Sequence, residues 1–144
     1  MKTERQISAG GVVFRRSNGL VDIALIAVKE GKVWCLPKGL VEKGENIART
    51  AHREVKEETG LDGKIIKLID NIHYFFISKE EGKTTRIFKI VYFFLMEYTG
   101  GDMSDHDTEV HDCRWFPMDE AIEIAEYKDE KGILVKAKAI LKLP

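Results

Sequence analysis

The chain has 144 residues, of which 44% are hydrophobic and 33% charged, a composition that can fill the core of one domain and excludes a disordered chain. Its 23 Lys and Arg residues nearly balance its 24 Asp and Glu residues, which excludes a broadly cationic nucleic-acid binder. The balance hides one segregated segment, because residues 101–130 carry 11 acidic and only 2 basic side chains. We expect a single domain over residues 1–144 with an acidic surface.

Signals for targeting or for disulfides are not found in the sequence. The N-terminus lacks the apolar core of a signal peptide, and the longest apolar run, residues 90–96, is far below the ~20 residues of a membrane-spanning helix. Cys35 and Cys113 lie in apolar surroundings without CxxC or Cys/His ligand spacing. We expect buried, reduced thiols in a cytoplasmic protein without a membrane partner, as a monomer or a homodimer.

The first part of the chain reads as strands that lead into one helix. Runs rich in apolar residues predict two strands and a shorter apolar piece, at 7–14, 21–28 and 33–36. A loop with two glycines follows over 37–44. A helix is then predicted over Ile47–Thr59, with Asn46 as its N-cap and Gly60 just past its end.

The second part predicts a long hairpin, a short strand and two helices. Runs rich in β-branched and aromatic residues predict strands at 64–77, 85–98 and 109–116, the first two separated by a polar turn at 79–83. Pro117 suits the opening of a helix that runs through Tyr127, and apolar residues at helical spacing predict a last helix over 133–143. This order predicts an α+β domain in which helices pack against a curved sheet.

Three glutamates share one face of the predicted helix over Ile47–Thr59. With Glu54 at zero and ~100° per residue, Glu57 falls at about −60° and Glu58 at about +40°. Arg53 lies four residues before Glu57 and can pair with it. A solvated, Glu-rich surface would explain these residues taken alone. A divalent cation would also relieve their mutual repulsion, and oxygen ligands favour Mg²⁺ or Mn²⁺.

A longer pattern contains these acids: Gly39, five residues, Glu45, seven residues, and then the sequence REVKEETGL from Arg53 to Leu61. This pattern resembles the Nudix box at all nine of its defined positions. The resemblance implies a Nudix-like α/β/α sandwich, with a curved mixed sheet between helices. It also implies a hydrolase that attacks phosphorus with water, acts on a nucleoside diphosphate linked to another moiety, and uses Mg²⁺, with Mn²⁺ as a possible substitute.

The resemblance implies roles for the residues of the motif. Glu54, Glu57 and Glu58 would bind the metal, together with the backbone carbonyl of Gly39. The remaining motif residues would orient or frame this cluster: Arg53 as the partner of the acids, Glu45 as a helix-start carboxylate linked to Arg53, and Gly60 at the end of the helix.

Many members of the family recruit a further acid from a loop outside the motif. Glu109, in the acidic segment, is the best match to that role. The general base would then be either Glu57 or Glu109, and the sequence does not decide between them. His52, His106 and His111 lack a nucleophile partner at a recognisable spacing, and we expect them to be surface or packing residues.

The sequence WCLPKG, which ends at Gly39, resembles the W-x-(L/F)-P-K-G segment before the box in diadenosine polyphosphate hydrolases. It implies a dinucleoside polyphosphate substrate, with diadenosine tetraphosphate favoured. Basic candidates for the polyphosphate are Lys38, Lys43, Lys32, Lys89 and Arg86. Aromatic candidates for the base are His73, Tyr74, Phe76 and Tyr92, of which alternation lets only some face a cleft. Trp34 is expected to pack in the core.

Other substrates remain open at this point. Noncanonical nucleoside triphosphates, 5′-triphosphorylated RNA and diphosphoinositol phosphates would undergo the same chemistry. The near-neutral charge does not favour RNA, and the basic residues are not clustered as an inositol polyphosphate would need. A non-catalytic nucleotide-binding module is a further alternative, but such a module would be expected to have lost some of the motif glutamates.

Overall fold

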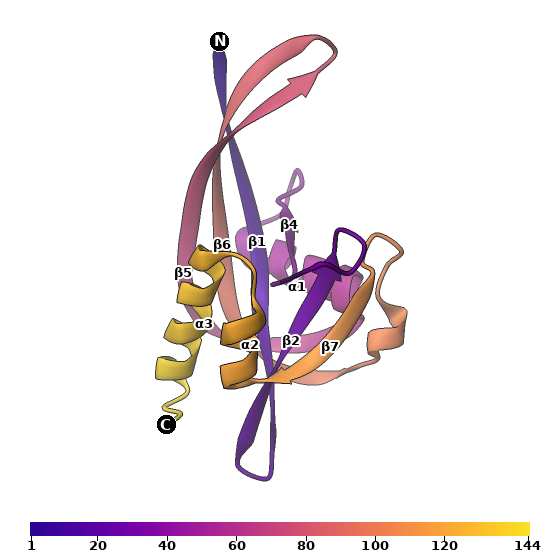
Figure 1. The fold of residues 1–144 in the computed structure, drawn as a ribbon, viewed down its shortest axis with the longest axis vertical. Helices are drawn as coiled ribbons and strands as arrows, with labels where there is room; N and C mark the ends of the chain where they lie inside the picture. The colour runs from indigo at the N-terminus through magenta and orange to yellow at the C-terminus, as the bar shows by residue number, and fades with distance from the viewer.

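The computed structural model describes residues 1–144 and shows one mixed β-sheet with helices on both faces (Figure 1). The strands are β1 (Lys2–Ser17), β2 (Leu20–Val28), β3 (Val33–Cys35), β4 (Lys38–Leu40), β5 (Leu61–Glu80), β6 (Lys83–Gly101) and β7 (Asp112–Pro117). The helices are α1 (Ile47–Thr59), the 3-10 helix η1 (Met103–Asp105), α2 (Met118–Ile124) and α3 (Lys128–Ile140). This architecture confirms the predicted α+β class and the sandwich of helices around a mixed sheet.

Strand β1 organises the sheet because it pairs with several other strands. The main order is β3-β2-β1-β6-β5, with β4 beside β1 and β7 beside β2, and β1 and β6 run parallel while the other pairs are antiparallel. Gly10 sits where β1 changes from β4 to β2 as its partner, and a Cβ there would lie 2.1 Å from the Pro37 carbonyl oxygen. The glycine therefore lets the backbone of β1 approach the segment that leads into β4.

The two faces of the sheet carry separate hydrophobic clusters. Alternate residues of β6 divide between them, so that Phe93 packs on the side of α2 and α3 while Phe94 packs on the side of α1. Ala51 and Val55 of α1 are fully buried against that second cluster. Burial of this apolar stripe fixes which side of α1 turns toward the sheet and which side carries the acids.

Helix α1 follows the sequence prediction residue for residue. The Asn46 side chain accepts the Arg49 backbone N–H at 2.8 Å, which caps the N-terminus, and Gly60 ends the helix in the left-handed region at φ 75°. Both caps are local interactions, so the sequence pattern was sufficient to place them.

Several other boundaries differ from the prediction. Strands β1, β5 and β6 continue into polar residues, because backbone pairing does not require apolar side chains. The predicted loop contains strand β4, whose three residues pair with β1. Strand β7 begins at Asp112, so Glu109 lies before it and not within it. Helix α2 ends at Ile124 and not at Tyr127. Helix α3 begins at Lys128, before the predicted start at residue 133, because its first turn is polar and lacks the apolar pattern.

The two cysteines are buried free thiols, as expected. Cys35 and Cys113 pack with Ile26 and Val110 in a small third cluster. Burial raises the pKa of each thiol to about 12, so both stay protonated near neutral pH. None of the helices combines the length and the apolar character that a bilayer crossing requires.

Candidate active site

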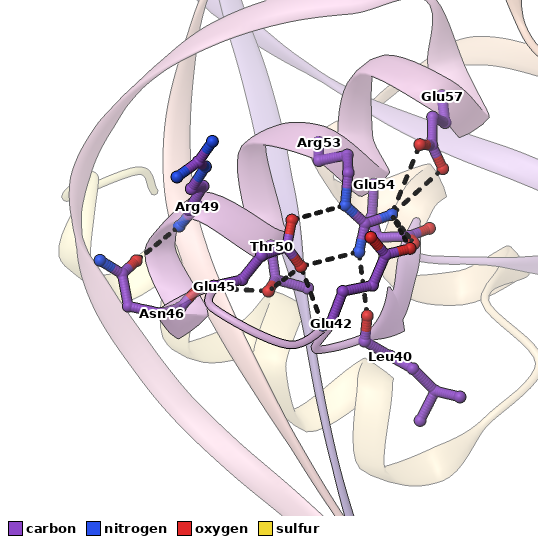
Figure 2. Close-up of polar contacts among 9 residues, drawn as sticks. All are labelled: Leu40, Glu42, Glu45, Asn46, Arg49, Thr50, Arg53, Glu54 and Glu57. Atoms are coloured by element: carbon purple, nitrogen blue, oxygen red, sulfur yellow. Dashed lines mark hydrogen bonds and ion pairs between the residues drawn. The ribbon is translucent and has the colours of Figure 1, made fainter.

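Arg53, on the exposed side of α1, is the centre of a polar cluster that joins the helix to the preceding loop (Figure 2). Its Nε and Nη2 donate to the two carboxylate oxygens of Glu45 at 2.7 and 2.9 Å, and Nη2 also donates to the Leu40 carbonyl at 3.0 Å. This two-point contact fixes the guanidinium plane. The link between Glu45 and the arginine that the sequence pattern implied is therefore present.

The Glu45 carboxylate accepts hydrogen bonds from several donors. Besides Arg53, it accepts the Glu42 backbone N–H at 3.0 Å and the Thr50 hydroxyl at 2.9 Å. Hydrogen bonding from Arg53, then from the Glu42 N–H, lowers the pKa of Glu45 to about 2. The carboxylate stays charged at any physiological pH and holds Arg53 in place.

The remaining nitrogen of Arg53 faces the acids of α1. Nη1 donates to Glu54 at 2.6 Å and approaches Glu57 at 3.3 Å (Figure 2). Glu57 is the more exposed of the two, with 49% of its side-chain surface accessible against 13% for Glu54. One guanidinium therefore touches two acids of the motif at once and sets their direction.

Glu54 and Glu58 lie against strand β4. A Cβ on Gly39 would be 2.1 Å from the carboxyl carbon of Glu54, so position 39 must lack a side chain for that carboxylate to stand where it does. The Lys38 backbone N–H donates to Glu58 Oε1 at 2.7 Å. Strand β4 and the helix are therefore in direct polar contact at this point.

Burial makes two of these acids costly to ionise. Burial raises the pKa of Glu58 to about 7, more than the Lys38 N–H offsets, and the Glu54 charge adds to the rise. The pKa of Glu54 is also raised, chiefly by burial, although Arg53 opposes the shift. The site thus contains two carboxyl groups whose charged form is destabilised, chiefly by burial.

The three motif glutamates do not form a preassembled cluster. Glu54 and Glu57 turn to Arg53, and Glu58 turns to the Lys38 N–H. No group of three or more His, Cys, Asp or Glu side chains has the arrangement of a metal site by itself. The possible metal ligands are nonetheless all oxygens, and the carboxylates of Glu54 and Glu58 are partly buried. This set fits a hard divalent cation that uses few protein ligands.

A loop between η1 and β7 packs against the end of α1. The Asp107 backbone N–H donates to the Glu57 carbonyl at 2.8 Å. The Asp107 side chain accepts the backbone N–H groups of Glu109 and Val110, at 3.1 and 3.3 Å. The loop expected to supply an acid therefore does reach the motif helix, with Glu109 exposed in its turn and not in the predicted strand.

Asp107 is the acid of this loop that the sequence analysis missed. Its charge contributes to the raised pKa of both Glu54 and Glu58. Only the folded structure distinguishes Asp107 from the other acids of segment 101–130, because its contacts with α1 cannot be read from the sequence.

A pocket of about 460 Å³ opens beside β4 on the α3 side of the sheet. Its walls come from β4, β5 and the start of α3: Lys38, Ile72, Tyr74, Tyr127, Lys128, Asp129 and Glu130. The Lys38 ammonium pairs with Glu130 at 3.0 Å. Burial alone would lower the pKa of this ammonium, but the Glu130 carboxylate outweighs burial and raises the pKa. Lys38 thus touches the motif acids through its backbone and lines the pocket with its side chain.

The predicted substrate residues divide between the two faces of the sheet. Tyr74 pairs with Lys89, and both share a face with Phe76. Burial, and then the Lys38 charge, lower the pKa of Lys89, and the pairing with Tyr74 puts Lys89 beside a residue of the pocket wall. Tyr74 and Lys38 are the predicted residues that line it.

The other candidates lie elsewhere. Tyr92 packs on the α1 face, and Arg86 stacks over Phe75 with 4.1 Å between its guanidinium carbon and the ring centroid, again away from the pocket. Lys43 and Lys32 are exposed and do not line it. The structure therefore does not bring these residues together with Tyr74, because residues on the adjacent strand β6 can match in type and still point to the opposite face of the sheet.

Tyr127 and Glu130 are pocket residues that the sequence analysis did not select. Tyr127 is the N-cap residue of α3, at the position where the helix that opens at Pro117 was predicted to end. Glu130 is buried in the first turn of α3. The sequence contains a faint signal for Tyr127, an aromatic residue between two helices. Glu130 gave none, because sequence reading treats an acid in an acidic segment as exposed.

Comparison with known proteins agrees with this geometry. The NUDIX domain family model matches residues 4–137. The chain is 35% identical to MutT4 of Mycobacterium tuberculosis over 98% of its own length, and it spans 58% of that protein. It is 30% identical to the asymmetrical bis(5′-nucleosyl)-tetraphosphatase of Sus scrofa, covering 93% of this chain and 94% of that one.

Solved structures show the same relationship. The crystal structure of the Ap4A hydrolase of C. elegans superposes with a TM-score of 0.65 at 27% identity, over 96% of this chain and 99% of that one. The family match, the relatives and the fold all coincide with the motif and its arginine-centred cluster. The chain therefore belongs to the Nudix family of pyrophosphohydrolases.

Proposed function

We propose that the chain is a Mg²⁺-dependent hydrolase of dinucleoside polyphosphates, with diadenosine tetraphosphate as the favoured substrate and two mononucleotides as products. One observation carries this choice: Lys38 contacts the motif acid Glu58 through its backbone and lines a pocket between two tyrosines with its side chain. A polyphosphate chain could then extend from the acids to a base in the pocket. The similarity to a bis(5′-nucleosyl)-tetraphosphatase and to an Ap4A hydrolase supports the same substrate class.

Nudix hydrolases generally use divalent metal ions, and the oxygen donors here suit Mg²⁺. Glu54, Glu57 and Glu58 would hold the ion together with the Gly39 carbonyl. When bound, Mg²⁺ supplies charge neutralisation at the phosphate oxygens and lowers the pKa of coordinated water.

The protein residues orient the reaction and move the proton. Arg53 keeps Glu54 and Glu57 directed along one side of α1 through the contacts at 2.6 and 3.3 Å. Glu57 is exposed enough to accept a proton from an attacking water. Glu109 is exposed on the loop that Asp107 attaches to α1, and it is the second candidate for the same step.

The pocket suits a purine nucleoside. Tyr74 and Tyr127 contribute aromatic rings from β5 and from the start of α3, and a base can stack on either ring. Lys38, with Lys89 nearby, supplies positive charge for the adjoining phosphates. The pocket volume of about 460 Å³ lies within the range of pockets that bind small molecules.

A substrate panel with Mg²⁺ tests the proposal. Diadenosine tetraphosphate should be hydrolysed with a higher kcat/KM than nucleoside triphosphates, because its phosphate chain is longer and ends in a second nucleoside that can add contacts. Chromatography identifies the products, and ¹⁸O-labelled water locates the attacked phosphorus. Preference for a triphosphate by tenfold or more would reject the substrate but not the family.

Replacing the proposed bases tests the proton transfer. Glu57→Gln should lower kcat by about 10²–10⁴-fold with the fold intact, because it removes both a base and a metal ligand. Glu109→Gln should shift or flatten the pH-rate profile. The exposed Glu120→Gln on α2 is the control and should behave as wild type. Near-normal hydrolysis by Glu57→Gln would remove that residue from the mechanism, and an unchanged profile for Glu109→Gln would do the same for the loop acid.

The raised pKa of Glu58 predicts how pH affects the metal-free protein. A carboxyl group that rises from 4.5 to about 7 on folding stabilises the folded state most below pH 4.5, and this contribution is lost as pH rises through about 7. In EDTA, the free energy of unfolding should fall between pH 5 and pH 8 by more in wild type than in Glu58→Gln. Added Mg²⁺ should restore stability at pH 8. Parallel pH curves for the two proteins would contradict the assignment.

Tyr127 offers a test of base stacking in the pocket. Tyr127→Ala should raise KM for diadenosine tetraphosphate about tenfold or more, because a base-aromatic stack contributes ~1–3 kcal/mol. Tyr127→Phe should remain close to wild type. Phe75→Ala, which removes an exposed ring on the opposite face, is the matched control. Equal KM values for Tyr127→Ala and the control would place the base elsewhere.

A further inference from the structure

Glu130 is a buried carboxylate that the reaction scheme does not use. It lies in the first turn of α3, and only 1% of its surface is exposed. One oxygen accepts the Leu36 backbone N–H at 2.8 Å, and the other accepts the Lys38 ammonium at 3.0 Å. Both partners lie more than 90 residues away in the sequence. Both of its oxygens are therefore committed to the segment just before Gly39.

The same part of α3 makes further contacts with that segment. The Glu126 backbone N–H donates to the Trp34 carbonyl at 3.0 Å. The Tyr127 ring centroid is 5.8 Å from the Lys38 ammonium. Residues 126–130 are thus bonded to residues 34–38 at three points, which hold the aromatic wall of the pocket and its cation together.

A lysine that binds phosphate benefits from such an anchor. Its ammonium ends a flexible four-carbon stem, and ordering that stem on binding costs conformational entropy. The pair with Glu130 orders the stem before substrate arrives. Glu130 itself is almost fully buried, and both of its oxygens are already paired. Its effect on substrate must therefore pass through Lys38.

We propose that Glu130 is a positioning residue for substrate binding, which holds the Lys38 ammonium at the polyphosphate and fixes it relative to Tyr127. The inference rests on the proposed phosphate-binding role of Lys38. Through the Lys38 N–H bond to Glu58, the same contact sets the distance between the base pocket and the motif acids. A buried ion pair that served stability alone would give no such dependence of binding on its geometry.

Glu130→Gln separates these roles. Its amide oxygen can still accept the Leu36 N–H, but the negative charge that pairs with the Lys38 ammonium is lost. Calorimetry should show about a tenfold weaker affinity for tripolyphosphate with Mg²⁺, in line with the loss of a charge-assisted hydrogen bond. KM for diadenosine tetraphosphate should rise similarly, with kcat within about threefold of wild type. Asp119→Asn is the control, because Asp119 also pairs with a lysine of α3, at 2.8 Å, but far from the pocket.

A double-mutant comparison tests whether Glu130 acts through Lys38. Lys38→Gln should weaken tripolyphosphate binding, and adding Glu130→Gln should weaken it no further. Additive effects would show an independent structural role and overturn the proposal. If Glu130→Gln does not fold, Lys38→Arg decides instead: it keeps the charge but moves it from the position that Glu130 defines. Unchanged affinity in Lys38→Arg would overturn the proposal.

Tripolyphosphate keeps this test distinct from the test of function. If wild type binds tripolyphosphate but does not hydrolyse diadenosine tetraphosphate, the proposed substrate fails while the binding data still decide the role of Glu130. If wild type hydrolyses the dinucleotide and Glu130→Gln matches it in both KM and tripolyphosphate affinity, the role of Glu130 fails alone. A wild-type protein without affinity for tripolyphosphate would overturn it too.

Discussion

The contact between Arg53 and Glu45 is the interaction on which the candidate site depends. It uses two guanidinium nitrogens on the loop side and leaves the third for Glu54 and Glu57. A single positive charge is thereby shared among several carboxylates, and it cannot neutralise them all. The pKa values of Glu54 and Glu58 are raised chiefly by burial, and repulsion from neighbouring carboxylates adds to the rise. A site built this way favours any ligand that brings positive charge.

Strand β4 connects this charged cluster to the pocket. Its three residues alternate, so that Gly39 faces the acids of α1 while the Lys38 side chain turns to the α3 side. The close approach of β1 at Gly10 holds the backbone before it, and Glu130 holds it from the other face. The position of one short strand is thus fixed from two directions, which is what a site requires when its parts come from distant segments.

Sequence reading succeeded where the interactions are local. The caps of α1 bond to residues within the helix, and the partners of Arg53 lie within 13 positions of it. It failed where a contact spans the chain. Strand β4 is defined by pairing with β1, and Glu130 meets Lys38 across 92 positions. The opposite faces of Tyr74 and Tyr92 likewise depend on strand register, which a list of aromatic residues does not contain.

The bond between Glu58 and Lys38 has a second consequence, for the edge of the sheet. Strand β4 pairs only with β1, so its outer side presents backbone groups that no neighbouring strand covers. Such edges can recruit strands from other molecules. Here the Lys38 N–H is already taken by the Glu58 carboxylate. Glu58, one of the acids proposed to bind the metal, therefore also occupies a backbone donor through which another chain could add a strand.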